Sequence, residues 1–246
     1  MIDNQNTQNI KKQITLHPIH GVSLGPGDPD LITVKGLKTL QEADVIYYPG
    51  SLFRSGTKSS YSLSILEHYD LDPLKLKGFF LEMTLERKQA QKIYEGIYQD
   101  IKLDFERGLK VAIVSEGDLS TFSSFSYLLE KIKTDRLNIK LVPGISSFSL
   151  LAAQCQTPLC LQNDKVVILP RIQTEDELRE AIMSFDTVIL MKIKSVIDVI
   201  DNVISDANYQ ISYGEHLGTN NEFLASSWKD VKSREIPYFS IITIQK

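Results

Sequence analysis

The feature that most constrains the fold is a turn rich in glycine and proline that lies between a predicted strand and a predicted helix. Residues 18–25 (PIHGVSLG) predict a strand, and residues 25–29 (GPGDP) predict a stiff turn after it. Residues 31–43 then carry apolar side chains at helical spacing, with Asp30 placed to cap the helix. A strand, a tight turn and a helix in this order predict the start of an α/β sheet.

The rest of the chain continues to alternate strands and helices. The pair Pro49 and Gly50 should stop the second strand, and Gly108 should end the long second helix. In the first half, strands are predicted at 44–48, 110–115 and 139–142, and helices at 85–107, 123–133 and 146–156. In the second half, strands are predicted at 165–169, 187–191, 210–213 and 239–244, with helices at 175–184 and 196–206. The last strand follows a short loop, which is typical of an antiparallel or mixed sheet.

This alternation predicts the α/β class with two domains. We expect a polar extension over residues 1–17, an N-terminal α/β domain over 18–120 and a C-terminal α/β domain over 121–246. The boundary is placed near residues 119–123, because ligands of open α/β sheets bind beyond the carboxyl ends of the strands. The turn that follows Ser115 is therefore where we expect a binding cleft.

Composition narrows the function classes. Net charge is −4 and no run of Lys and Arg forms a basic stripe, which argues against a nucleic-acid partner. No apolar run reaches the roughly 18 residues that span a bilayer, and residues 1–13 lack the apolar core of a signal peptide. Cys155 and Cys160 are expected to be free thiols in a reducing compartment, which favours a cytoplasmic protein. The scattered histidines predict no metal site; they are His17, His20, His68 and His216.

Three predicted strands end in turns made of small residues. These turns are residues 25–29, residues 115–118 (SEGD) and residues 142–147 (VPGISS). Such turns direct backbone N–H groups at a ligand, and three of them should gather at one edge of the sheet. None ends in the Gly-Lys-Ser/Thr of a P-loop or matches the dinucleotide fingerprint, and no G-x-S-x-G nucleophile motif is present. Each turn also has a purely structural interpretation, with Asp118 as a turn residue and Ser146 as a helix cap.

With these motifs in order, the chain resembles the tetrapyrrole methylase family from about His20 to Ile244. The resemblance is carried by the three turns, by residues 43–51 (ADVIYYPGS), and by residues 188–192 (VILMK). It implies two α/β domains of the tetrapyrrole methylase type with the cofactor in the cleft between them. It also implies a homodimer and an S-adenosylmethionine-dependent methyl transfer to C-20 of precorrin-2 or cobalt-factor II.

The resemblance further implies which residues bind S-adenosylmethionine, mostly through their backbone. These residues are Pro26, Glu116, Gly117, Asp118, Thr121, Ser146, Ser147, Met191 and Leu217. Two positions depart from the patterns of other members. Leu119 stands where the family usually has proline, and Pro49 stands where members that methylate uroporphyrinogen have aspartate. The second departure favours the C-20 reaction over the first methylation of the pathway.

Other functions stay open on the same fold. They are another tetrapyrrole methylase step, a methylase like diphthine synthase, and a cofactor-binding protein without catalysis. Methyl transfer from a sulfonium is an in-line displacement, so positioning and partial desolvation should supply most of the rate. Tyr48 and Asp118 are candidates for a general base. Because the substrate carries many carboxylates, we expect cations near the cleft; the candidates are Arg54, Lys58, Arg87 and Lys88.

Overall fold

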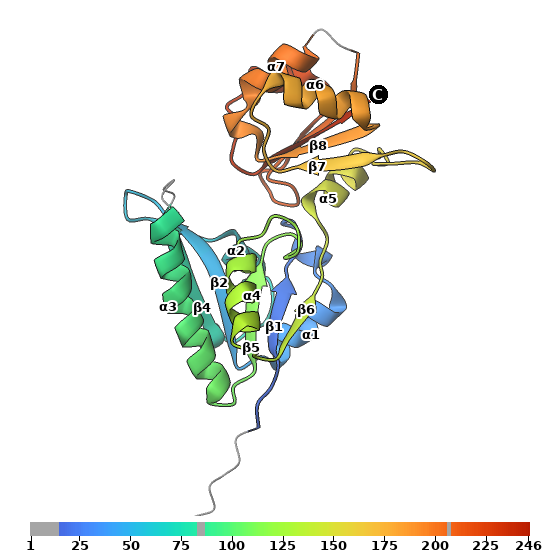
Figure 1. Ribbon diagram of the computed structural model, residues 1–246. Helices are drawn as coiled ribbons and strands as arrows, with labels where there is room; N and C mark the ends of the chain where they lie inside the picture. The colour runs from blue at the N-terminus through green and yellow to red at the C-terminus, as the bar shows by residue number, and fades with distance from the viewer. Residues whose placement is uncertain (1–14, 83–86, 206–207) are drawn as a thin grey trace, which may run out of the picture.

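The computed structural model describes residues 15–82, 87–205 and 208–246. The chain forms two α/β domains that lie one above the other, and a single extended segment joins β6 of the first to α5 of the second (Figure 1). Among the described residues, no helix is long and apolar enough to cross a membrane. The predicted α/β class with two domains is confirmed by this arrangement.

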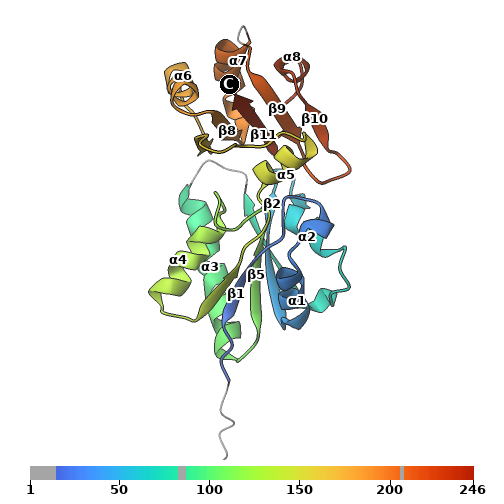
Figure 2. The same cartoon turned by 90° about the vertical axis from the view of Figure 1, so that its right-hand side faces the viewer.

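The first domain is a sheet covered by helices on both faces (Figure 2). Its strands run in the order β3-β2-β5-β1-β6, with β4 paired to β2. The strands are β1 (Ile19–Ser23), β2 (Val45–Leu52), β3 (Lys58–Ser59), β4 (Leu76–Glu82), β5 (Val111–Ser115) and β6 (Ile139–Val142). The helices are α1 (Val34–Glu42), α2 (Tyr61–Leu66), α3 (Arg87–Glu106) and α4 (Phe125–Thr134), with short 3-10 turns at Pro29–Leu31 and Pro73–Lys75. All residues of β5 are buried, as its apolar sequence predicts.

The second domain is a mixed sheet in the order β10-β9-β11-β8-β7. Its strands are β7 (Val166–Leu169), β8 (Thr187–Met191), β9 (Gln210–Glu215), β10 (Phe223–Ala225) and β11 (Ser240–Gln245). Its helices are α5 (Ser147–Gln154), α6 (Glu175–Ser184), α7 (Ile197–Ile204) and α8 (Trp228–Val231), with a 3-10 turn at Ile193–Ser195. Strand β7 is parallel to β8, whereas β11 is antiparallel to β8 and β9, as the short loop before the last strand indicated. Helix α5 packs on one face, and α6 and α7 pack on the other.

The first sheet continues beyond the boundary suggested by the sequence at residues 120 and 121. Strand β6 pairs in parallel with β1, and α4 packs into the same core as α3. The chain therefore leaves the first domain only after Val142. We propose that the boundary lies in the segment 143–146, between β6 and α5.

Several local predictions were wrong. Strand β2 does not stop at Pro49 but continues to Leu52, because β4 pairs with it along this stretch. The partner strand β5 has already left β2 after Tyr47, so a residue without an N–H is tolerated there. The region between β2 and α3 was left without predicted elements, yet it contains β3, α2 and β4.

The first helix also begins differently from the prediction. Thr33 is its N-cap, and the Thr33 hydroxyl accepts a hydrogen bond from the N–H of Gly36, whereas Asp30 lies in the preceding 3-10 turn. Val34 is one of the apolar residues of the predicted helix 31–43, but it is 71% exposed. The N-cap of α5 is Ser146 as expected, but its side chain makes no capping hydrogen bond.

Candidate functional site

The three small-residue turns meet at the carboxyl end of the first sheet. The N–H of Gly25 donates to the carbonyl of Gly117 at 3.2 Å, and the N–H of Gly117 donates to the carbonyl of Gly25 at 2.7 Å. The third turn joins them, because the N–H of Gly144 donates to Asp118 Oδ2 at 2.8 Å. The clustering predicted from the parallel strands is therefore present, and backbone contacts hold the turns together.

Asp118 ties two of these turns to each other. Its other oxygen, Oδ1, accepts hydrogen bonds from the backbone N–H of Ser120 at 2.9 Å and from the Ser120 hydroxyl. Burial by itself would raise the pKa of this carboxyl, but the bonds from Ser120 and Gly144 outweigh it and hold the pKa below its usual range. A carboxylate with a lowered pKa is a weak base, so we assign Asp118 a structural role instead of a catalytic one.

Leu119 stands where the resemblance implies a proline, and its turn stays closed by hydrogen bonds. Its backbone N–H donates to the hydroxyl oxygen of Ser23 at 3.0 Å, a bond that proline has no N–H to make. The Leu119 side chain is buried in the core shared by α3 and α4. The turn thus gains a hydrogen bond to the end of β1 in place of the rigidity of a proline ring.

The second domain closes over the first turn through its own glycine loop. A Cβ at Gly27 would collide with the carbonyl oxygen of Leu217, and a Cβ at Gly218 would collide with the backbone N of Asp28. Both glycines have positive φ angles, +152° and +74°. Tyr61 on α2 reaches across as well, with its hydroxyl 3.4 Å from the carbonyl oxygen of Leu217. These backbones approach so closely that only glycine fits.

The remaining predicted cofactor residues lie on the same loops. Pro26 and Leu217 are buried, and Thr121 is half-buried two residues after Leu119. Ser146 and Ser147 open α5 at the junction of the domains, and Met191 ends β8. The structure therefore gathers residues from both domains, and their contact with a cofactor stays a prediction.

Tyr48 belongs to the core and not to the loops. It packs among residues of α2 and β4, with its ring edge-on to Phe80 at 6.3 Å between centroids. Burial raises the pKa of its hydroxyl, and the charge of Glu67 adds to that rise. We therefore do not retain Tyr48 as a candidate base.

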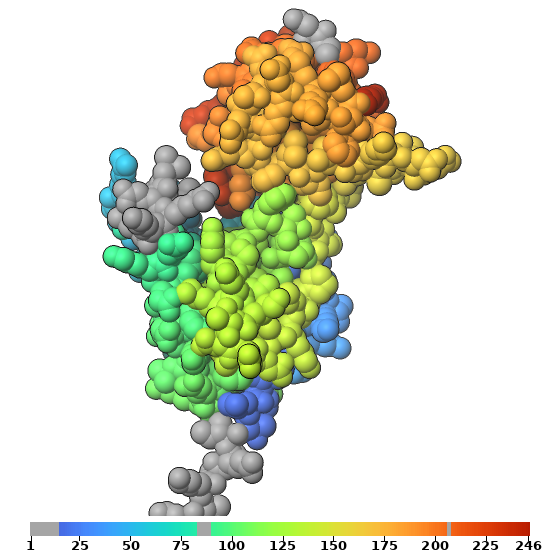
Figure 3. Space-filling model, in the orientation of Figure 1, coloured from blue at the N-terminus to red at the C-terminus, as the bar shows by residue number. Residues whose placement is uncertain are grey.

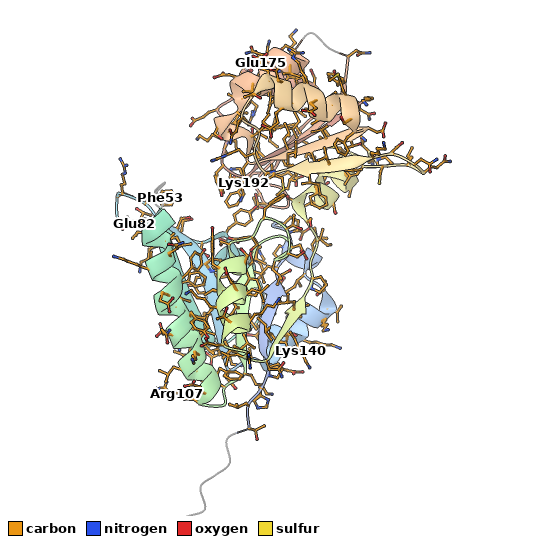
Figure 4. The ribbon with its side chains drawn as sticks, in the orientation of Figure 1. Phe53, Glu82, Arg107, Lys140, Glu175 and Lys192 are labelled. Carbon is orange, nitrogen blue, oxygen red and sulfur yellow. The ribbon has the colours of Figure 1, made fainter. Side chains whose placement is uncertain are left out.

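Two of the four predicted cations lie on the hairpin between β2 and β3. Arg54 is exposed at its tip, and the Lys58 amine lies 4.8 Å from the centroid of the Phe80 ring. Figure 4 shows the neighbouring Phe53 at the edge of the first domain that faces the second. Arg87 and Lys88 begin α3, but their side chains lie outside the described residues.

The structure adds residues that were not among the predicted site residues. Lys192 follows β8 in a left-handed conformation with φ 58° and ψ 47°, which is uncommon for a residue with a Cβ and often marks a functional site. Its amine lies 5.6 Å from the centroid of the exposed Tyr238 ring, and Figure 4 shows it on the underside of the second domain. Phe239, the next residue, stacks on Tyr61 at 4.7 Å between centroids and so joins the two domains.

A hollow separates the two domains on the side of α3, as the space-filling view shows (Figure 3). The loops described above lie where the domains meet behind it. Comparison with known proteins identifies this arrangement: residues 18–228 match the family described as Tetrapyrrole (Corrin/Porphyrin) Methylases. The chain belongs to this family. The resemblance stated from the motifs is therefore confirmed.

Relatives of this tetrapyrrole methylase cover most of its length. It is 25% identical to the cobalt-precorrin-2 C(20)-methyltransferase of Salmonella typhimurium over 93% of the chain and 96% of that protein. It is 32% identical to a probable cobalt-precorrin-2 C(20)-methyltransferase of Methanocaldococcus jannaschii over 72% of the chain and 73% of that protein. A precorrin-2 C(20)-methyltransferase of a Sinorhizobium species is 27% identical over 91% and 93%.

Solved structures share the fold at lower sequence identity. A cobalt precorrin-4 methyltransferase superposes with a TM-score of 0.70 at 21% identity, covering 93% of this chain and 94% of the other. A uroporphyrin-III C-methyl transferase from Thermus thermophilus, complexed with S-adenosyl homocysteine, superposes with a TM-score of 0.62 at 16% identity, covering 94% and 98%. These similarities support the two-domain fold.

Proposed function

We propose that this protein transfers a methyl group from S-adenosylmethionine to C-20 of precorrin-2 or of cobalt-factor II in the biosynthesis of the corrin ring of cobalamin. The observation that carries the proposal is the similarity to relatives named for the C-20 reaction, two of which align over more than nine-tenths of both chains. Relatives named for cobalt-precorrin-4 C(11)-methylation align over less of this chain, 62% and 77%. The C-20 step is therefore favoured over another tetrapyrrole step.

The junction of the loops suits a methyl donor that is held mainly by backbone groups. A Cβ at Gly27 or Gly218 would collide with the backbone of the facing loop, and a Cβ at Gly144 would collide with Ser23 at the end of β1, so the loops pack closely against one another. S-adenosylmethionine supplies an electrophilic methyl group when it is bound. We propose that it is held by the residues of the predicted set that line this junction, which are Pro26, Glu116, Gly117, Thr121, Ser146, Ser147, Met191 and Leu217, while Asp118 fixes the loops.

Cations on both sides of the hollow suit a substrate with many carboxylates. Arg54 and Lys58 lie on the hairpin of the first domain, and Lys192 lies on the second. A carboxylate between such groups gains charge-assisted hydrogen bonds that are stronger than bonds between neutral groups. We propose that these three residues bind the carboxylates of the tetrapyrrole.

The test is to incubate the protein with S-adenosylmethionine and either precorrin-2 or cobalt-factor II, and to measure the product mass. We expect the gain of one methyl group, located at C-20 by carbon NMR with a labelled donor. In Arg54→Ala with Lys58→Ala, KM for the tetrapyrrole should rise about tenfold while the affinity for S-adenosylhomocysteine is unchanged. The matched control is Lys140→Ala, which removes an exposed cation from β6, away from the hairpin. A methyl gain by uroporphyrinogen alone would contradict the C-20 assignment.

We also propose that the protein is a homodimer in the cytoplasm. The support is the resemblance to the family, together with the free cysteines Cys155 and Cys160. Light scattering on the purified protein should then give about twice the chain mass of 27.8 kDa. A monomer at micromolar concentration would contradict the dimer.

A further inference from the structure

Tyr61, the first residue of α2, contacts both domains. Figure 2 shows α2 at the end of the first domain that faces the second. The Tyr61 side chain packs against the core of its own domain, while its ring lies 4.7 Å between centroids from the ring of Phe239, just before β11. Its hydroxyl donates to the carbonyl of Leu217 at 3.4 Å. One side chain anchored in the first domain therefore contacts two segments of the second.

The Tyr61 hydroxyl lies where the turn 25–29 of the first domain meets the loop 216–219 of the second. A Cβ at Gly27 would lie 2.2 Å from the carbonyl oxygen of Leu217 and 2.8 Å from the Tyr61 hydroxyl, so these three groups converge on one point. Burial raises the pKa of the hydroxyl to about 12, which keeps it a hydrogen-bond donor at neutral pH. Tyr61 thus touches the backbone on both sides of the proposed cofactor junction, although it is not among the residues proposed to bind the cofactor.

The segment just before Tyr61 is the hairpin whose cations we propose to bind the substrate carboxylates. Lys58 lies three positions before Tyr61, on β3, which pairs with β2. Between them, the Ser60 hydroxyl donates to the carbonyl of Pro49 at 2.5 Å and accepts from the N–H of Leu63 at 3.0 Å. Ser60 therefore caps α2 and also ties it to β2. A restraint on the hairpin reaches Tyr61 through a short segment that is held by hydrogen bonds.

We propose that Tyr61 is a positioning residue that couples tetrapyrrole binding at the hairpin to S-adenosylmethionine binding at the junction. This inference rests on the proposed function. A tetrapyrrole whose carboxylates are held by the hairpin restrains the start of α2 and, with it, Tyr61. The loop that Tyr61 contacts then loses less freedom when the cofactor binds, which strengthens cofactor binding. Such coupling is reciprocal, so the cofactor strengthens tetrapyrrole binding by the same factor.

Calorimetric titration with S-adenosylhomocysteine, with and without a saturating tetrapyrrole, measures this coupling without turnover. The tetrapyrrole is precorrin-2 or cobalt-factor II. In the wild type, the tetrapyrrole should lower the Kd of S-adenosylhomocysteine at least fivefold, the lower end of usual coupling. Tyr61→Phe keeps the ring contact and loses the hydroxyl, so the Kd without tetrapyrrole should rise about two- to tenfold, as for one hydrogen bond, and the coupling factor should fall to half or less. Tyr61→Leu also loses the ring contact, and its coupling should be below twofold.

The matched control is Tyr209→Phe. Tyr209 precedes β9, at the opposite end of that strand from Leu217, so its hydroxyl can be removed away from the junction. Both the Kd and the coupling factor should equal those of the wild type. Circular dichroism and thermal unfolding check that the variants fold, and Tyr61→Phe decides if Tyr61→Leu does not fold.

Two results would overturn the inference. One is a wild type that binds both ligands with a coupling below twofold. The other is a coupling factor that stays at the wild-type value in the Tyr61 variants while the affinity for S-adenosylhomocysteine falls, because Tyr61 would then only shape the cofactor site. A wild type that binds S-adenosylhomocysteine but neither tetrapyrrole, or that does not bind S-adenosylhomocysteine, would instead sink the proposed function, and the inference with it.

Discussion

Replacing Asp118 with alanine tests whether its carboxylate fixes the site. The side chain is 8% exposed and accepts hydrogen bonds from the N–H of Gly144 and from the N–H and hydroxyl of Ser120. A hydrogen bond to a charged group contributes about 1.5–3 kcal/mol to stability. Ser120 is exposed, so water can replace part of the hydrogen bonding that Ser120 loses. Gly144 is half-buried, so water replaces the hydrogen bond of its N–H less well. We expect the free energy of unfolding to fall by about 2–4 kcal/mol.

Urea unfolding of the wild type and of Asp118→Ala at pH 7 measures this change. Asp118→Asn keeps one oxygen but turns an amide N–H₂ toward a donor, so its loss should be of similar size. Asp70→Ala is the control, because it removes an exposed carboxylate and should change stability by less than about 0.5 kcal/mol. The affinity for S-adenosylhomocysteine should fall at least tenfold in the Asp118 variants alone, since the turns would no longer be held together.

The pH dependence of the same variant gives an independent check. The folded state lowers the pKa of Asp118, so the stability from its carboxylate is present above the unfolded pKa of about 3.9. It is lost as the pH falls through the lower folded pKa. The difference between wild type and Asp118→Ala should therefore be full at pH 7 and shrink as the pH falls below that unfolded value. A difference below 0.5 kcal/mol at pH 7, or one that grows on acidification, would refute the reasoning.

Two further substitutions test the backbone contacts. Gly27→Ala places a Cβ against the carbonyl oxygen of Leu217 and should weaken S-adenosylhomocysteine binding at least tenfold, measured by calorimetry. The control is Gly96→Ala, which adds a Cβ in open space on α3. It should keep the affinity and stabilise the helix by up to about 1 kcal/mol. Leu119→Pro removes a buried side chain and also the backbone N–H that donates to Ser23. The free energy of unfolding measured in urea should therefore fall by about 1–3 kcal/mol. An unchanged or raised stability would show that the turn gains nothing from Leu119.

The local part of the site was predictable because short-range rules determine it. A strand followed by a short turn of small residues and then a helix can adopt few conformations, and parallel strands bring such turns to one edge. The mutual hydrogen bonds of Gly25 and Gly117 realise that expectation. The resemblance to the family added the contacts of the second domain near Leu217, which no spacing in the first half indicates.

The errors arose where pairing between distant segments outweighed a local signal. Pro49 and Gly50 signal a turn, but β4, about thirty residues later, pairs with β2 and carries the strand through them. The first sheet continues past the predicted boundary between residues 120 and 121 for the same reason, since β6 returns to pair with β1. A local sequence pattern indicates the structure that a segment favours by itself. Whether the segment forms a strand also depends on the neighbouring strand that pairs with it.

The pKa shifts of Glu116 and Asp118 also could not be predicted from the local sequence. Glu116 and Asp118 lie two residues apart in one turn, and sequence alone gives them the same ordinary carboxyl chemistry. Burial raises the pKa of Glu116 and outweighs the lowering effects of Ser62 and Lys192. For Asp118, the hydrogen bonds from Ser120 and Gly144 outweigh burial and lower the pKa. The pairing of these groups exists only once both sheets have formed and met. The opposite shifts therefore follow from contacts between distant segments, which no local sequence pattern specifies.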